Sequence, residues 1–255
     1  MASQPRLRVF AGPNGSGKST LKDRLPPEWL GVYVNADDIE KTIKAEGGLD
    51  LSVFAISASN EELVSFLNAS TLLQQQGLSD DVASMKLQGQ RVVFNQLMVN
   101  SYHASVLVDF IRRKLLASLI SFTFETVMSS PDKVDFICEA QAAGFRTYLY
   151  FVATEDPEIN VSRVKHRVAT GGHAVPTDKI ISRYKRSLNL LSQAVACTDR
   201  AYVFDNSGAY RVWIAEVTNG RELEMRTEAM PHWFKSSLWD AFEADDSVRI
   251  FKLMT

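Results

Sequence analysis

The stretch that decides the fold is L-R-V-F-A-G-P-N-G-S-G-K-S-T, residues 7–20. It satisfies the pattern G-x-x-x-x-G-K-[ST], which begins here at Gly12 and ends at Ser19. A short apolar run precedes it and a helix-compatible segment follows, as a phosphate-binding loop requires. Such a loop turns tightly and points backbone N–H groups inward, which needs residues free to adopt positive φ angles. We therefore predict a nucleotide-binding site at residues 12–20.

Each residue type in this loop has a chemical reason to be there. Lys18 offers a full positive charge to the terminal phosphates, and Ser19 offers a hydroxyl to Mg²⁺, which prefers oxygen ligands. The expected cofactors are ATP or GTP together with Mg²⁺. The residues expected to bind the nucleotide are Gly12, Pro13, Asn14, Gly15, Ser16, Gly17, Lys18, Ser19 and Thr20.

Composition indicates an ordinary globular protein. The 255 residues include 45% hydrophobic and 23% charged residues, and 28 basic against 30 acidic side chains leave a net charge of −2. No charge excess favours nucleic acid or an anionic membrane as a partner. The first residues lack the apolar core of a signal peptide, so we expect a cytoplasmic protein in which Cys138 and Cys197 stay reduced.

The alternation of strand and helix patterns predicts the fold class. Apolar runs at residues 7–11, 32–35, 119–124, 147–153 and 201–204 read as strands. Helical patterns cover residues 132–143, 157–168 and 178–197. This order favours one α/β domain spanning 1–255, a doubly wound and mostly parallel sheet of the P-loop kinase type. Thr218-Asn219-Gly220 predicts a C-terminal β-hairpin, and Trp233, Phe234 and Trp239 read as packing residues.

A helical insertion is expected at about residues 40–117. Its sequence reads as helix and loop, with an amphipathic pattern near its end. It separates the second expected strand from the third, so it is a candidate cap over a substrate. A helical appendage with only a packing role is the alternative.

Acidic residues follow two of the expected strands. Asp37 and Asp38 come after the second strand, and Glu125 with Thr126 ends the third. In open α/β sheets, ligands bind beyond the carboxyl ends of the strands, where the phosphate-binding loop also lies. We take Asp37 as the catalytic candidate and the other three as candidate substrate ligands. Glu125 could instead be a carboxylate stabilised by the dipole of the following helix.

Two arginines four positions apart suggest a basic lid. Arg163 and Arg167 share a face of the helix at 157–168, and G-G-H-A-V-P follows at residues 171–176. Arginine suits phosphate because its guanidinium offers paired donors and stays charged. Solubility alone is the competing account. Arg183 and Arg186, on the next helix, could reach phosphate or remain solvated.

These residues together supply what phosphoryl transfer requires: groups that hold the phosphates, neutralise the developing charge and align the acceptor oxygen. The motif set consists of A-G-P-N-G-S-G-K-S-T at 11–20, V-N-A-D-D-I at 34–39, F-E-T at 124–126, R-V-x-x-R-V-x-x-G-G-H-A-V-P at 163–176 and R-Y-K-R-S-L at 183–188. It resembles the zeta toxin family of P-loop kinases.

The resemblance implies a nucleotide-dependent small-molecule kinase whose acceptor is a hydroxyl of a nucleotide-sugar such as UDP-N-acetylglucosamine. It also implies a possible antitoxin protein as a partner. Carried onto this chain, the phosphate-gripping lysine is Lys18, the catalytic aspartate is Asp37, and Arg167 fits one lid position. Arg163, Arg183 and Arg186 compete for the other. A kinase of another metabolite or nucleotide, and a nucleotide-dependent interaction module without transferase activity, remain as alternatives.

Overall fold

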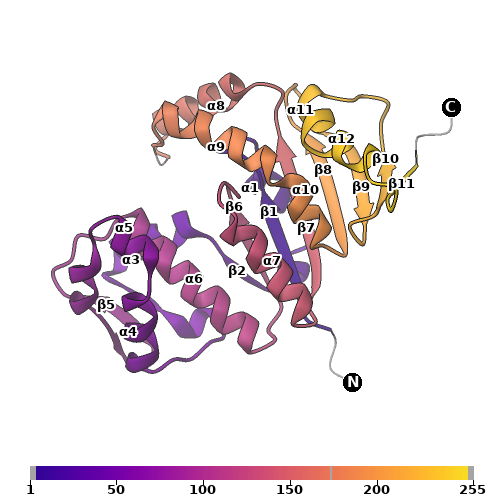
Figure 1. Ribbon diagram of the computed structural model, residues 1–255. Helices are drawn as coiled ribbons and strands as arrows, with labels where there is room; N and C mark the ends of the chain where they lie inside the picture. Colours follow the sequence, from indigo (N-terminus) through magenta and orange to yellow (C-terminus); the bar gives the residue numbers. More distant parts are fainter. Residues whose placement is uncertain (1–3, 173, 252–255) are drawn as a thin grey trace. The chain divides into compact units, whose positions relative to one another are not determined.

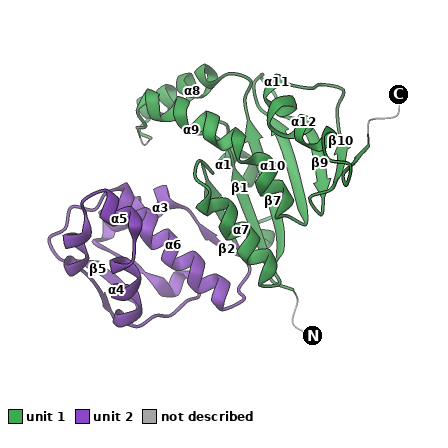
Figure 2. Ribbon diagram, viewed as in Figure 1, with its two compact units in different colours: residues 1–30, 123–255 green, residues 31–122 purple. Residues whose placement is uncertain are grey.

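The structure is a computed structural model that describes residues 4–172 and 174–251 (Figure 1). Its internal contacts divide the chain into two compact units, which Figure 2 colours separately. Unit 1 holds the residues up to 30 and those from 123 on, and unit 2 holds residues 31–122. The phosphate-binding loop therefore belongs to unit 1, and the expected insertion belongs to unit 2. The expectation of a single domain with an insertion at about 40–117 stays a prediction.

Unit 1 is built on a sheet whose strands are β1 (Arg6–Ala11), β6 (Phe122–Thr126), β7 (Arg146–Ala153), β8 (Arg200–Asp205), β9 (Val212–Thr218), β10 (Glu222–Met225) and β11 (Arg249–Phe251). Their order in space is β11-β10-β9-β8-β7-β1-β6. β7 pairs in parallel with both β1 and β8, whereas β9 runs antiparallel to β8 and β10. The predicted α/β fold, with a mostly parallel sheet and a C-terminal hairpin, is confirmed.

The central strands are apolar because both of their faces are buried, as in parallel sheets generally. In β1, Leu7, Val9 and Phe10 are fully buried, and in β7 so are Leu149 and Phe151. The strand sequences therefore read as continuous apolar runs rather than as alternating ones. This is the pattern from which they were predicted.

Helices cover this sheet and connect its strands. They are α1 (Lys18–Lys22), α2 (Pro27–Leu30), α7 (Asp132–Ala142), α8 (Pro157–Ala169), α9 (Thr177–Asn189), α10 (Leu191–Ala196), α11 (His232–Phe234) and α12 (Asp240–Glu243), with a π-helical turn, η3 (Lys235–Trp239), between the last two. In Figure 1, α7 and α10 cross the face of the sheet that is turned toward the viewer. The prediction that Trp233, Phe234 and Trp239 are packing residues is confirmed, because all three are buried.

Two boundaries differ from the expected ones. The helix expected over 178–197 is two helices, because α9 ends at Asn189 and α10 begins at Leu191. The strand expected from residue 119 begins instead at Phe122. Leu119 has a φ of 53°, and the N–H of Ile120 donates to the carbonyl of Leu115. These are the marks of a Schellman motif, so this residue ends a helix rather than starting a strand.

Unit 2 contains β2 (Val32–Val34), α3 (Ala36–Glu46), α4 (Asn60–Asn68), α5 (Thr71–Gln75) and α6 (Ser101–Ala117), with 3₁₀ turns η1 (Leu51–Phe54) and η2 (Ser79–Ser84). It also contains an antiparallel sheet of β3 (Gly48–Asp50), β5 (Arg91–Phe94) and β4 (Met85–Gln88), in that order. The sequence interpretation expected only helix and loop here and was wrong about these strands. They are too short to show a period of two.

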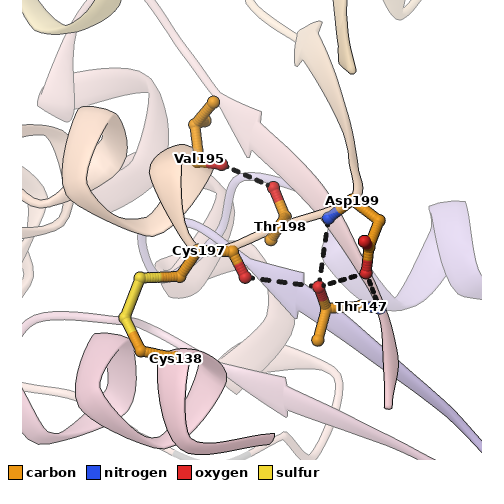
Figure 3. The surroundings of a disulfide bond; sticks show 6 residues. All are labelled: Cys138, Thr147, Val195, Cys197, Thr198 and Asp199. Atoms are coloured by element: carbon orange, nitrogen blue, oxygen red, sulfur yellow. Dashed lines mark hydrogen bonds between the residues drawn. A yellow bond between two sulfur atoms is a disulfide. The ribbon is translucent and has the colours of Figure 1, made fainter. Parts of the chain in front are cut away.

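A disulfide joins Cys138 of α7 to Cys197, the residue that follows α10 (Figure 3). The expectation of two reduced thiols is therefore wrong. The two Cα atoms are 4.8 Å apart because α7 and α10 pack side by side, which the 59 positions between the cysteines did not reveal. Beside the disulfide, Thr147 donates to the carbonyl of Cys197, and its N–H donates to the carboxylate of Asp199 at 2.7 Å.

In the part of the chain that the structure describes, no helix is both long and apolar enough to cross a membrane.

Candidate active site

The phosphate-binding loop (residues 12–20) leaves β1 in a conformation that only glycine adopts without strain. Gly12 has a φ of 135°, and a side-chain carbon on it would collide with the carbonyl oxygen of Val152 in β7. Gly17 has a φ of 97° and is the N-cap residue that precedes α1. The loop therefore turns tightly with these glycines at positive φ, as the sequence pattern predicted, and it packs against the neighbouring strand.

Lys18 folds back over the loop. Its Nζ donates to the carbonyl oxygens of Gly12 at 2.8 Å and of Pro13 at 2.9 Å. The ammonium group is thus held at the mouth of the turn and orders the loop backbone. This is a suitable position for a cation that meets phosphate.

Two asparagines outside the loop hold its carbonyl groups. Asn160 of α8 is fully buried, accepts from the Thr154 hydroxyl and donates to the carbonyl of Asn14 at 2.6 Å. Asn206, which follows β8, donates to the carbonyl of Ser16 at 2.8 Å. Sequence reasoning missed both residues.

A tyrosine supports the first of these contacts. Tyr184 of α9 donates its hydroxyl to the carbonyl of Thr154 at 2.6 Å, and burial raises the pKa of the phenol above its usual value. The neutral phenol is therefore a stable donor. The sequence signal that could have identified Asn206 is its place at the carboxyl end of a parallel strand. Asn160 and Tyr184 carry no such signal, because both lie within helical apolar patterns.

Ser19 and Glu125 meet in the structure. Because β6 lies beside β1, Glu125 at the end of β6 comes next to the loop, where its Oε2 accepts from the Ser19 hydroxyl at 2.9 Å. Thr126 accepts from the N–H of Met128 at 2.9 Å. The structure therefore brings Ser19 and Glu125 together.

The two lid arginines differ in their surroundings. Arg163 is half-buried on α8, and its Nη1 is buried with no hydrogen-bond partner, whereas Arg167, one turn further along, is exposed. α8 and α9 pack against each other through Val161, Val164 and Ile180. Arg183 and Arg186 lie on α9, half-buried and exposed respectively. His173, in the expected lid, lies outside the described residues.

Asp37 and Asp38 belong to unit 2. Both are exposed in the first turn of α3, where the side chain of Asn35 caps the helix by accepting from their backbone N–H groups. Their carboxylates take no part in the cap. They are therefore available to a ligand of this unit.

The loop fits a polyphosphate with a magnesium ion. The hydroxyl of Ser16 and the Oδ1 of Asn14 are buried without hydrogen-bond partners, so the loop holds polar atoms that its own fold does not satisfy. Among the described residues, no group of three or more His, Cys, Asp or Glu side chains is arranged to hold a metal. Mg²⁺ commonly binds through one or two protein oxygens together with phosphates and water, which matches the pair of Ser19 and Glu125.

Comparisons with known proteins identify related chains. A family model described as Zeta toxin matches residues 83–218. An uncharacterized protein of Haemophilus influenzae is 32% identical over 65 residues, which cover 26% of this chain and 46% of that protein. The chain thus spans about half the length of this relative.

Two crystal structures of the complex of AvrRxo1-ORF1 and AvrRxo1-ORF2 are similar in fold. The native complex gives a TM-score of 0.54 at 16% identity over 92% of this chain and 63% of that chain. The complex with sulphate ions gives 0.52 at 15% identity over 88% and 62%. At these identities the likeness concerns the fold alone. Because the matching family model spans more than half of the residues, the chain belongs to the zeta toxin family.

Proposed function

We propose that the chain is an ATP- and Mg²⁺-dependent kinase that phosphorylates a hydroxyl of a nucleotide-sugar such as UDP-N-acetylglucosamine. The observation that carries the proposal is the hydrogen bond between Ser19 and Glu125. Phosphate-binding loops serve kinases, hydrolases and switches alike. A carboxylate beside the loop serine supports metal-dependent phosphoryl transfer, and family membership supports a kinase.

The loop residues would hold the nucleotide. Lys18 would exchange its loop carbonyl contacts for the β- and γ-phosphates, while backbone N–H groups of residues 12–20 cradle the chain of phosphates. Ser19 would bind Mg²⁺, and Glu125 would orient that hydroxyl. When bound, ATP and Mg²⁺ supply the phosphoryl group and the positive charge that offsets its developing negative charge.

Charged side chains outside the loop complete the proposal. Arg163 and Arg167 would neutralise charge on the transferring group, since a guanidinium offers paired donors to phosphate oxygens. Asp37 would accept the proton of the acceptor hydroxyl and so increase its nucleophilicity. Asp38 and Thr126 would bind the acceptor. The proposal requires Asp37, which is exposed on α3, to reach the acceptor in the working enzyme.

A protein partner is part of the proposal. AvrRxo1-ORF1, which shares the fold, was solved in complex with AvrRxo1-ORF2. By that likeness, we propose that an antitoxin-type protein binds this chain and blocks its activity. Co-purification of a neighbouring gene product, with loss of ATP binding in the complex, is the expected result; an active complex would contradict it.

The decisive experiment follows γ-labelled phosphate from ATP to UDP-N-acetylglucosamine. We expect transfer by the unchanged chain, none by Lys18→Ala, and a loss of about 10²–10⁴-fold in Asp37→Asn with ATP binding retained. Asp80→Asn is the matched control, because Asp80 is also an exposed acid in the first turn of a helix of unit 2.

Each other outcome removes a defined part of the proposal. Transfer to a different compound in a metabolite extract would remove the nucleotide-sugar and keep the kinase. ATP binding without transfer to any acceptor would remove the kinase and support a nucleotide-dependent interaction module. Undiminished transfer by Asp37→Asn would remove the role given to Asp37.

A further inference from the structure

An arginine that the motifs do not include contacts the phosphate-binding loop. Arg211 lies in the connection between β8 and β9, and its Nη2 donates to the Thr20 hydroxyl at 2.8 Å. Thr20 in turn donates to the carbonyl of Gly17 at 2.8 Å. A guanidinium 191 positions further along the chain is thus attached to the last residue of the loop.

Arg211 and Glu125 lie on opposite sides of the loop. Consecutive helical residues point about 100° apart, so Ser19 and Thr20 face different directions. Ser19 contacts Glu125 at the end of β6, and Thr20 contacts Arg211 after β8. In the sheet, β6 lies on one side of β1 and β8 lies on the other, beyond β7.

This arrangement gives the two ends of a bound nucleotide different neighbours. This inference rests on the proposed function, in which Ser19 and Glu125 lie beside the metal and the terminal phosphates. Thr20 and Arg211 then lie beside the end where the phosphate chain joins the nucleoside. The backbone of such loops cradles the α- and β-phosphates, whereas the lysine reaches the β- and γ-phosphates. The phosphate nearest Arg211 is then the α-phosphate.

The charges around Arg211 favour an anion. Burial, and after it the positive charge of Arg24, lower the pKa of the Arg211 guanidinium below its usual value. Its Nε is buried without a hydrogen-bond partner. Within residues 4–172 and 174–251, neither of these arginines forms an ion pair. Two neighbouring cations without a carboxylate repel each other, and a bound phosphate would relieve that repulsion.

Asp205 does not supply the missing negative charge. This carboxylate ends β8 but is buried, accepts from the indole N–H of Trp233 at 2.7 Å and from the Ser207 hydroxyl at 2.8 Å. Its lone pairs are thus used within the fold. The same contacts make it unsuited to reading a purine base.

We propose that Arg211 is a nucleotide-binding residue that holds the α-phosphate of a nucleoside triphosphate from the side of the loop opposite to Glu125. Thr20 anchors the guanidinium while the site is without ligand. A phosphate contact does not distinguish adenine from guanine. Arg211 therefore contributes affinity for the triphosphate and no choice of base.

The test is a binding measurement, because binding does not depend on the acceptor or on turnover. Calorimetric titration with Mg²⁺ compares ATP, GTP and inorganic tripolyphosphate on the unchanged chain, on Arg211→Gln and on Arg211→Lys. Glutamine can still donate to Thr20 but carries no charge, whereas lysine keeps the charge without the fork. The matched control is Arg249→Gln, since Arg249 is exposed and lies on the edge strand β11, which four strands separate from β1.

We expect Arg211→Gln to bind all three ligands about tenfold to a hundredfold more weakly, the loss of one charge-assisted hydrogen bond. Arg211→Lys should lie between it and the unchanged chain, and Arg249→Gln should bind normally. Unchanged affinities in Arg211→Gln would overturn the inference. So would a loss restricted to ATP and GTP, which would mean contact with the nucleoside.

The melting temperature without ligand separates binding from folding. If Arg211→Gln melts like the unchanged chain but binds more weakly, the inference is supported. If its affinity becomes normal at a temperature well below its melting point, the weak binding came from partial unfolding, and the inference is contradicted. If the unchanged chain binds triphosphate but transfers none, the proposed function fails while this inference stands. If it transfers phosphate and Arg211→Gln binds normally, this inference alone fails.

Discussion

The Ser19 hydroxyl donates to Oε2 of Glu125 at 2.9 Å, although 106 positions separate the two residues. The contact exists because β6 lies beside β1, and Glu125 stands at the end of β6 while Ser19 follows the loop that leaves β1. Glu125→Gln keeps the size of the side chain and removes its charge. Since partners of metal-binding groups tune metal affinity, the variant should need about 10–100-fold more Mg²⁺ for half-maximal transfer.

ATP affinity at saturating Mg²⁺ should stay close to normal in Glu125→Gln, because the loop itself is unchanged. The measurement is a Mg²⁺ titration of initial rates, with Glu228→Gln, at an exposed position, as the control. An unaltered Mg²⁺ requirement would show that Glu125 has no part in metal binding.

Gly12→Ala should prevent the loop from folding normally. Its φ of 135° is unfavourable for alanine, and the added carbon would meet the carbonyl of Val152. Backbone strain of this kind costs about 1–3 kcal/mol, and the steric conflict adds to it. Chemical denaturation should show the lower free energy of unfolding. Gly208→Ala should leave that free energy nearly unchanged, because a Cβ atom added at Gly208 meets no other part of the chain within 4 Å. Equal stability of the two variants would contradict the described loop.

The features that could be predicted are those with a local pattern in the sequence. The loop at 12–20, the central strands and the hairpin at Asn219 each carry a local signal, either a motif, an apolar run or a turn pair. Glu125 could be placed at the carboxyl edge of the sheet, where ligands bind, because it ends an apolar strand. Its position beside Ser19 depends on the order of the strands, which only the structure shows.

Contacts that depend on side-by-side packing could not be predicted. Asn160 lies within a helical pattern of its own segment, and only the folded chain brings it to the loop. The pairing of Cys138 with Cys197 likewise depends on the packing of two helices, and the short strands β3, β4 and β5 depend on one another. No local period of the sequence records such contacts.

Asn160→Asp should loosen the loop without changing the shape of the side chain. The aspartate can still accept from Thr154 but cannot donate to the carbonyl of Asn14, which then loses its partner. An unsatisfied buried group costs about 1–3 kcal/mol. We expect a lower unfolding free energy and weaker ATP binding, each compared with the exposed control Asn189→Ala. Normal ATP affinity would show that the loop does not depend on α8.

Removing the disulfide should lower stability without affecting the nucleotide site. A cross-link over this separation of 59 positions stabilises by about 2–4 kcal/mol in the loop-closure account. The carbonyl of Cys197 accepts a hydrogen bond from Thr147 near the start of β7, whereas the phosphate-binding loop packs on Val152 near the end of that strand. The Cys138→Ser, Cys197→Ser chain should therefore unfold at lower denaturant and bind ATP normally.

Reducing agent provides the control for this prediction. It should destabilise the unchanged chain by the same amount and leave the double variant unaffected. Two titratable thiols in the folded, unreduced chain would contradict the disulfide.

The structure singles out Arg163 among the four candidate arginines. Asn160 and Arg163 are three positions apart and so lie on one face of α8, the face that Asn160 turns to the loop. Burial of its Nη1 without a partner leaves Arg163 a donor aimed away from solvent. Arg163→Ala should lower kcat/KM for transfer about 10²-fold or more, as removal of a charge-stabilising donor does.

Arg163→Lys should restore part of that loss, because it keeps the charge and loses the fork. Lys165→Ala, an exposed position on the same helix, should leave kcat/KM unchanged, and Arg183→Ala and Arg186→Ala should have smaller effects than Arg163→Ala. A decrease confined to kcat, with ATP affinity unaltered, would mean that Arg163 meets the phosphate only as it transfers. If Arg183→Ala loses activity and Arg163→Ala does not, the second lid position belongs to α9. The burial of the Arg163 Nη1 without a partner is then unrelated to phosphate transfer.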